Sequence, residues 1–177
     1  RLAAQVVAGQ FGMTWGVTGF VTMIASAWLP PKVPVFGMLS AEKKFGELDA
    51  LFLKLTKVFC IITAVSALAV WLVICALNMA RHPFALRLLP VLPATIFLAA
   101  QVITVFSLPF SAYLRAHKEE PLVSVSVGAG LLTLAGVFIL GRYSVTAVGS
   151  GYLAISSLSL LCILFIWDRY RKKCHAP

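Results

Sequence analysis

Charged residues are scarce in this chain. Asp, Glu, Lys and Arg make up 12% of its 177 residues, about half of the roughly 25% found in soluble domains. Hydrophobic residues make up 60%, and this imbalance excludes an ordinary water-soluble core. Charge is entirely absent from five long stretches, which are Leu2–Pro31, Val58–Ala80, Leu88–Leu114, Pro121–Gly141 and Tyr143–Trp167.

Each uncharged stretch is long enough to cross a membrane as a helix. A spanning helix needs about 20 mostly apolar residues to cross a hydrocarbon core of about 30 Å. The sequence therefore predicts an all-α, polytopic transmembrane helical bundle that forms a single domain over residues 1–177. The five predicted spans lie at about 2–29, 58–79, 88–113, 121–141 and 145–167, and a cytoplasmic tail follows at 168–177.

The sequence also lacks the patterns that carry catalysis or metal binding. It contains no HExxH, GxSxG or P-loop motif, and its four cysteines form no CxxC pair. His82, His117 and His175 fall between the predicted spans or in the tail. We therefore expect no enzyme, no catalytic residue, no cofactor and no metal site. The net charge of +9 comes from short loops rather than from a basic patch, so nucleic acid is not an expected partner.

The Lys and Arg residues are sorted by side, which predicts an orientation. The connections after the first and third spans and the tail hold eleven of them, and the opposite side holds four. By the positive-inside rule the richer side is cytoplasmic. The carboxyl terminus is then cytoplasmic and the amino end of the chain lies outside. Because the chain begins with Arg1 rather than methionine, we expect an upstream part.

Two predicted spans carry amide and hydroxyl side chains at helical spacing. Residues three or four apart share one face of a helix, so each set forms a polar stripe. The stripes are Gln10, Thr14, Thr18, Thr22 and Ser26 in the first span, and Gln101, Thr104, Ser107 and Ser111 in the third.

Such stripes have two interpretations. Hydroxyl groups are common in helix–helix packing inside membranes, and for hydroxyls alone we favour that interpretation. Two striped spans interrupted by glycine or proline also fit the lining of a transport path. The candidate residues for a substrate path are Gln10, Thr14, Thr18, Gln101 and Thr104.

The cytoplasmic connections hold two further predicted features. Apolar residues recur at helical spacing over residues 41–57, which predicts an amphipathic helix on the membrane surface with Ser40 as its N-cap. After the third span, Arg115, His117 and Lys118 are candidates for contact with an anionic headgroup. A turn that only sets topology is the alternative there, and we favour it. Pro109 is expected to kink the third span.

Ionisable residues are missing from the middle of every predicted span. Proton pumps, voltage sensors and intramembrane proteases place such a residue there because a charged or titrating group performs the work. This absence argues against the handling of a coupling ion within this part of the protein.

Several segments resemble one family of transporters. They are Ser111–Pro121, Gly141–Tyr143, Gly151–Tyr152, Ala27–Pro34 and Glu47–Phe52. They resemble the carboxyl-terminal region of bacterial polysaccharide-biosynthesis flippases, which belong to the multidrug, oligosaccharidyl-lipid and polysaccharide exporter superfamily. The resemblance covers nearly the whole chain.

The resemblance implies a fold and a function. The chain would be the carboxyl-terminal portion of a two-lobed exporter whose amino-terminal half is missing here. Its substrate would be a lipid-linked oligosaccharide, such as a polysaccharide or O-antigen precursor, flipped across the bacterial inner membrane by alternating access. A proton or sodium gradient is the candidate driving force, and the lipid bilayer is the other partner. No catalytic-type residue is transferred, only the placement of Gln10, Thr14, Gln101 and Thr104 toward the cavity.

Two other functions stay open from the sequence. The chain fits a multidrug or metabolite efflux protein of the same superfamily, which an upstream acidic residue and aromatic substrate contacts would favour. It also fits a non-catalytic membrane scaffold subunit, which small-residue packing without a continuous polar path would favour.

Overall fold

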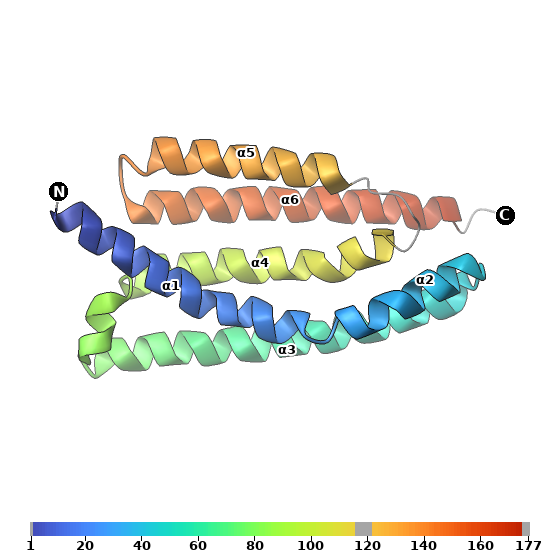
Figure 1. Ribbon diagram of the computed structural model, residues 1–177, viewed down its shortest axis with the longest axis horizontal. Coiled ribbons are helices and arrows are strands. Elements are labelled where there is room, and N and C mark those ends of the chain that lie inside the picture. Colours follow the sequence, from blue (N-terminus) through green and yellow to red (C-terminus); the bar gives the residue numbers. More distant parts are fainter. Residues whose placement is uncertain (1, 116–121, 175–177) are drawn as a thin grey trace.

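The computed structural model describes residues 2–115 and 122–174, and every regular element in these ranges is a helix. The elements form an elongated bundle (Figure 1). The long helices are α1 (Leu2–Ser26), α3 (Phe45–Met79), α4 (Val91–Arg115), α5 (Leu122–Leu140) and α6 (Val145–Cys174). Three short helices connect them: η1 (Pro30–Lys32), α2 (Val33–Ala41) and η2 (Pro83–Arg87).

The predicted all-α bundle is confirmed, with one difference among its spans. Four helices are long and apolar enough to cross a membrane: α3, α4, α5 and α6. The first helix, α1, has 25 residues and so measures about 37 Å, which is also sufficient length. It is not among the four because its polar stripe and its glycines lower its mean hydropathy.

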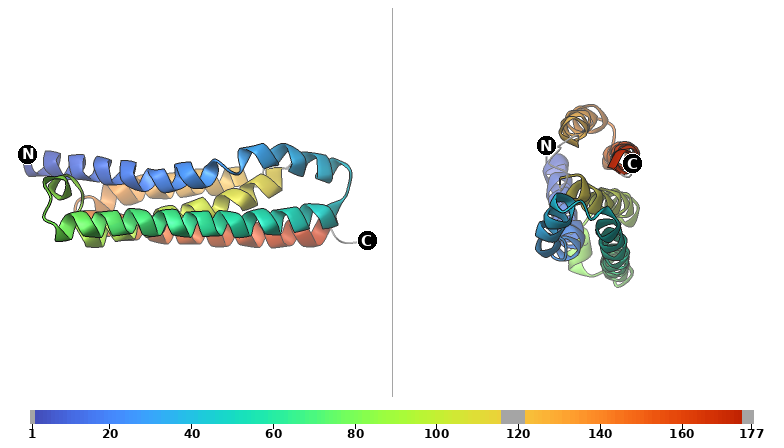
Figure 2. Two further views of the ribbon diagram at one scale, coloured as in Figure 1. Left: turned by 90° about the horizontal axis from the view of Figure 1, so that it is seen from below. Right: turned by 90° about the vertical axis from the view of Figure 1, so that its right-hand side faces the viewer.

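The helices are arranged around α4. On one side α4 packs against α1 and α3, and on the other it packs against α6. The helix α5 lies at the margin of the bundle (Figure 2), where it packs mainly against α6 and buries none of its residues. The long helices run along a common axis, as expected for spans of one membrane.

The two ends of the bundle differ in charge. The connection from α1 to α3, the end of α4 and the end of α6 lie at one end, and the α3–α4 and α5–α6 connections lie at the other (Figure 1). Among the described side chains, we call the first the basic end because it carries Lys32, Lys43, Lys44, Lys54, Lys57, Arg115, Arg169, Arg171 and Lys172. The opposite end carries Arg81, Arg87 and Arg142.

The predicted interfacial helix over residues 41–57 requires correction. Residues 45–57 are the first part of α3, which continues without a break through the predicted span at 58–79. The predicted surface helix and the predicted span meet at Lys57 and Val58, and neither residue breaks a helix, so the two segments form one helix. The apolar face of this part, including Leu48 and Phe52, is buried against Phe36 of α2 and Tyr113 of α4. Other helices of the protein therefore cover the apolar face of residues 45–57, which was predicted to lie on the membrane surface.

The turn between α2 and α3 lies where the sequence predicted an N-cap at Ser40. Ser40 is inside α2, and Lys43 has φ of 56°. The Lys43 amide donates to the Ser40 carbonyl at 3.2 Å and the Lys44 amide to the Leu39 carbonyl at 3.0 Å, which is the Schellman ending of a helix.

A hydrogen bond to Glu42, reinforced by the Glu42 charge, raises the pKa of the exposed Lys44 amine.

Two other boundaries differ from the predicted ones. The first helix ends at Ser26, and Pro30 and Pro31 begin η1 rather than ending a longer span. At the far end, α6 extends to Cys174, so residues 168–174 of the predicted tail are helical. Pro109 lies inside α4, and α4 changes direction toward its carboxyl end (Figure 1), as expected where a proline removes a backbone donor.

Candidate functional site

Two side chains of the α1 stripe attach α1 to the segment that precedes α4. The Gln10 amide nitrogen donates to the Leu86 carbonyl at 2.9 Å. The Leu89 backbone amide donates to the Thr14 hydroxyl at 2.9 Å, and both residues are buried. Leu89 lies between η2 and α4 and has no helical partner for its amide, so Thr14 satisfies a donor that would otherwise be buried without a bond.

The other stripe residues make different contacts. Thr18 is as deeply buried as Thr14, but its hydroxyl donates to the Trp15 carbonyl of its own helix at 3.1 Å. The Gln101 amide nitrogen donates to the Thr22 hydroxyl and joins α4 to α1. The amide oxygen of Gln101 is buried and receives no hydrogen bond from the described residues.

Thr14→Val is expected to lower the stability of the bundle, because the isosteric change leaves the Leu89 amide without an acceptor. An unsatisfied buried donor costs about 1–3 kcal/mol. Thr18→Val is the matched control, since it removes only a bond within α1. Thermal unfolding in detergent measures both variants. Equal losses for the two would show that the Leu89 bond contributes nothing specific.

A cavity of about 160 Å³ lies between α4, α5 and α6. All of its lining residues are uncharged, and half of them carry a hydroxyl group. These hydroxyl residues are Thr104 and Ser107 on α4, Thr133 on α5, and Tyr152, Ser156 and Ser159 on α6.

The hydroxyl groups of the cavity are only partly satisfied by the protein. Thr104 donates to the Ala100 carbonyl at 2.9 Å and lies 3.2 Å from the Ser156 hydroxyl. The Tyr152 hydroxyl is 3.5 Å from Thr104, near the limit of a hydrogen bond. Within the described part of the chain, Ser159 forms no hydrogen bond through its hydroxyl. The cavity thus offers donors and acceptors without charge.

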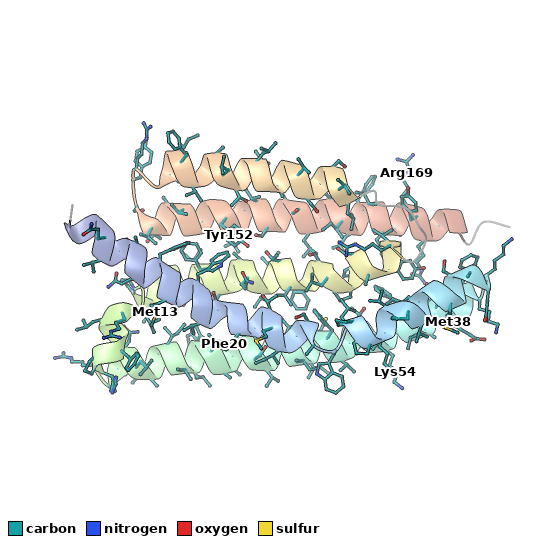
Figure 3. The ribbon with its side chains drawn as sticks, in the orientation of Figure 1. Met13, Phe20, Met38, Lys54, Tyr152 and Arg169 are labelled. Atoms are coloured by element: carbon teal, nitrogen blue, oxygen red, sulfur yellow. The ribbon has the colours of Figure 1, made fainter. Side chains whose placement is uncertain are left out.

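Of the five predicted path residues, only Thr104 lines this cavity. Gln10, Thr14 and Thr18 lie along α1 outside it. Tyr152, where α6 approaches α1 and α4 (Figure 3), was not assigned a role from sequence. The spacing of Tyr152, Ser156 and Ser159, four and then three residues apart, is a polar stripe that could have identified this face of α6.

The candidates for headgroup contact are only partly described. Arg115 is the last residue of α4 and is exposed at the basic end. His117 and Lys118 lie outside the described residues.

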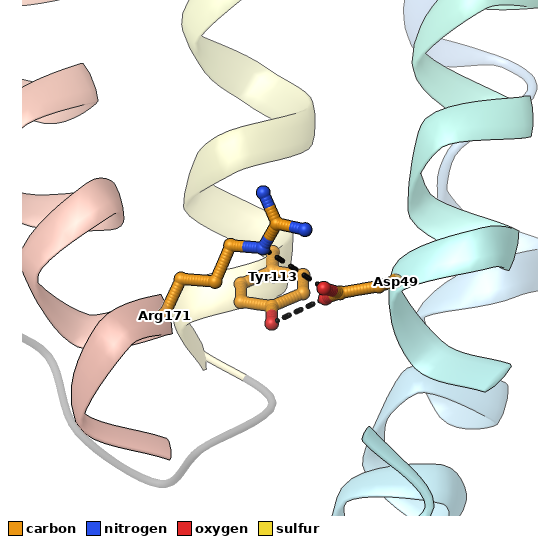
Figure 4. A network of polar contacts seen from close by, with 3 residues as sticks. All are labelled: Asp49, Tyr113 and Arg171. Atoms are coloured by element: carbon orange, nitrogen blue, oxygen red, sulfur yellow. Dashed lines mark hydrogen bonds and ion pairs between the residues drawn. The ribbon is translucent and has the colours of Figure 1, made fainter. Parts of the chain in front are cut away.

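A second polar site joins three helices at the basic end (Figure 4). Asp49 of α3 is 8% exposed. One of its carboxylate oxygens accepts a hydrogen bond from the Tyr113 hydroxyl of α4 at 2.8 Å, and the other accepts one from Arg171 Nε of α6 at 2.9 Å. The Arg171 guanidinium also lies 5.4 Å from the ring centre of Trp167, which favours a cation–π contact.

Aromatic rings enclose this second site. Phe52 contacts Tyr113, Phe110 and Trp167 with ring centres 4.9, 5.4 and 5.6 Å apart. These rings shield Asp49 from water, while the Arg171 side chain remains 41% exposed. No sequence pattern indicated this site, because Asp49 lies in the segment predicted as a surface helix and Arg171 in the predicted tail.

The fold and these sites define the class of the chain. Its four long apolar helices are those of a multi-pass membrane protein. Comparisons with protein-family models, with curated proteins and with solved structures give no significant match.

Proposed function

We propose that this chain is the carboxyl-terminal part of a transporter that flips a lipid-linked oligosaccharide across the bacterial inner membrane by alternating access. The observation that carries the proposal is the hydroxyl-lined cavity between α4, α5 and α6. Neutral sugars are rich in hydroxyl groups, so they pair with uncharged donors and acceptors such as Thr104, Tyr152 and Ser156. The charged pyrophosphate that joins the sugars to the lipid would require compensating charge, which the lining residues lack, so the cavity is assigned to the sugars alone.

The distribution of polar groups along the bundle also supports transport. The contacts of Gln10 and Thr14 with the segment before α4, and of Gln101 of α4 with α1, supply polar groups at successive depths. The charge difference between the ends supports a cytoplasmic basic end, with the carboxyl terminus inside. Resemblance to the flippase family supports the choice of substrate and the participation of an amino-terminal half.

The test is a flipping assay with the full-length protein in proteoliposomes. The probe is an isoprenoid pyrophosphate disaccharide with a fluorophore that a membrane-impermeant reductant bleaches from outside. We expect the protein to raise the bleached fraction above that of protein-free liposomes. Folded, reconstituted protein that leaves the fraction unchanged, with and without proton and sodium gradients, would contradict the proposal.

One observation favours efflux of aromatic compounds as a second candidate. Trp15 of α1, 41% exposed, contacts Phe11, Phe97 and Tyr152 with ring centres 5.9, 6.5 and 5.6 Å apart. This aromatic cluster adjoins the cavity through Tyr152 and suits planar or cationic drugs. Uptake of a fluorescent aromatic cation by the same proteoliposomes, without movement of the disaccharide lipid, would favour this candidate.

A further inference from the structure

The cluster of Asp49, Tyr113 and Arg171 links parts of the bundle that otherwise stay apart. The helices α3 and α6 lie on different sides of α4 (Figure 1), and each packs extensively against α4 rather than against the other. The Arg171–Asp49 ion pair reaches directly from α6 to α3 across the end of α4. Tyr113 adds α4 to the same carboxylate. Three helices therefore share one buried acceptor at the basic end.

The end of the bundle opposite the basic end contains a groove. A groove of about 690 Å³ separates α1 from the α5–α6 hairpin. It is lined by Val7 and Phe11 of α1 and by Val137, Val145 and Val148 of the hairpin, together with smaller residues. Thus α3, α4 and α6 are tied together at the basic end, whereas α1 and the α5–α6 hairpin are separated at the other end.

The end of α4 that carries Tyr113 begins just after a weak point in the helix. Pro109, four residues earlier, has no backbone amide to donate to the Val105 carbonyl. A helix bends most readily where its hydrogen-bond ladder is interrupted. The segment from Phe110 to Arg115 can therefore move relative to the rest of α4 at little cost in backbone hydrogen bonds.

From these observations we propose that Asp49, Tyr113 and Arg171 form a latch that holds the bundle closed at the basic end. Release of the latch lets α6 and the last turns of α4 move away from α3, which opens the basic end. The proposal rests on the proposed function only in that a transporter must open at each end in turn. Its test measures conformation without substrate, so its failure leaves the flipping assay unaffected.

The experiment uses the accessibility of one introduced cysteine in the full-length protein. The native Cys60, Cys75, Cys162 and Cys174 are replaced by alanine, and Ala112→Cys is added as the reporter. Ala112 is 6% exposed and packs in the cluster with Phe52 and Tyr113. A membrane-impermeant thiol reagent is applied to the basic side of sealed vesicles, and the rate of labelling is measured.

Asp49→Asn and Arg171→Gln are each expected to raise the labelling rate about tenfold, since hydrogen bonds to charged groups are the stronger ones. Tyr113→Phe keeps the ion pair and is expected to have a smaller effect. The double variant of Asp49 and Arg171 should label no faster than either single variant, because both remove one interaction.

The neighbouring Lys172 supplies the matched control. It pairs with Asp168 within α6, and both side chains are more than half exposed, so Lys172→Gln should leave labelling unchanged. A second reporter, Ala94→Cys, lies fully buried at the other end of α4 and detects unfolding. Unchanged labelling of Ala112→Cys in the latch variants, an equal rise in Lys172→Gln, or a parallel rise at Ala94→Cys would each overturn the proposal.

Discussion

Replacing Gly130 with leucine is expected to abolish most of the flipping activity while the bundle stays folded. Gly130 of α5 lines the hydroxyl cavity, and a Cβ atom added there meets nothing within 4 Å. A leucine at this position therefore meets no backbone clash, and we expect its side chain to occupy the cavity that Gly130 lines. We expect a fall in the rate of the disaccharide lipid assay of about tenfold or more, equivalent to about 1.4 kcal/mol or more in the barrier.

Gly128→Leu is the control for this prediction. Gly128 lies on the same helix with the same free space around its Cβ, but it faces a different depression, next to Ser124 and Cys162. We expect this variant to transport at nearly the parent rate and to unfold at the same temperature as Gly130→Leu. If both leucines reduce transport equally, the hydroxyl cavity is not the substrate site.

Gly149→Ala is expected to weaken the contact between α4 and α6, the most extensive in the bundle. Its Cβ would lie 3.2 Å from Ile96 and 3.3 Å from Phe97. Phe97 cannot easily move, because it is 2% exposed and its ring packs against Phe11 and Trp15. Overpacking of this kind costs about 1–3 kcal/mol, which exceeds the gain of about 1 kcal/mol that alanine brings to a helix interior.

The measurement is thermal unfolding of the purified protein in detergent, with Gly16→Ala as the control. Gly16 is inside α1, and its Cβ would have no neighbour within 4 Å, so only the gain in helix propensity remains. We expect the midpoint to fall for Gly149→Ala and to stay or rise for Gly16→Ala. A midpoint for Gly149→Ala at or above that of the parent protein would show that α4 and α6 do not approach as described.

The element boundaries show why some features could be predicted and others could not. The runs without charge located the long helices because hydropathy is a local property of the chain. The turn at Lys43 was missed because its left-handed conformation is one for which glycine is the usual marker. Without that marker, the charged residues near 41–57 were read as a separate surface helix.

The sequence also predicted the polar stripes only in part: it indicated their shared face but not their hydrogen-bond partners. Spacing placed Thr14 and Thr18 on one face of a helix, and the structure buries both. Spacing could not show that Thr14 bonds the next segment while Thr18 bonds its own helix. The direction of a hydroxyl depends on which neighbour is packed beside it, so identical residues four apart came to differ in role.

The amino-acid sequence by itself determined that the chain is a helical membrane protein, because length and apolarity of each segment suffice for that conclusion. Only the tertiary structure decided the partners of the polar groups. Leu89 meets Thr14 from 75 residues away, and Asp49 meets Tyr113 and Arg171 across 64 and 122 residues. Contacts over such separations follow from how the helices pack, and no local pattern in the chain records them.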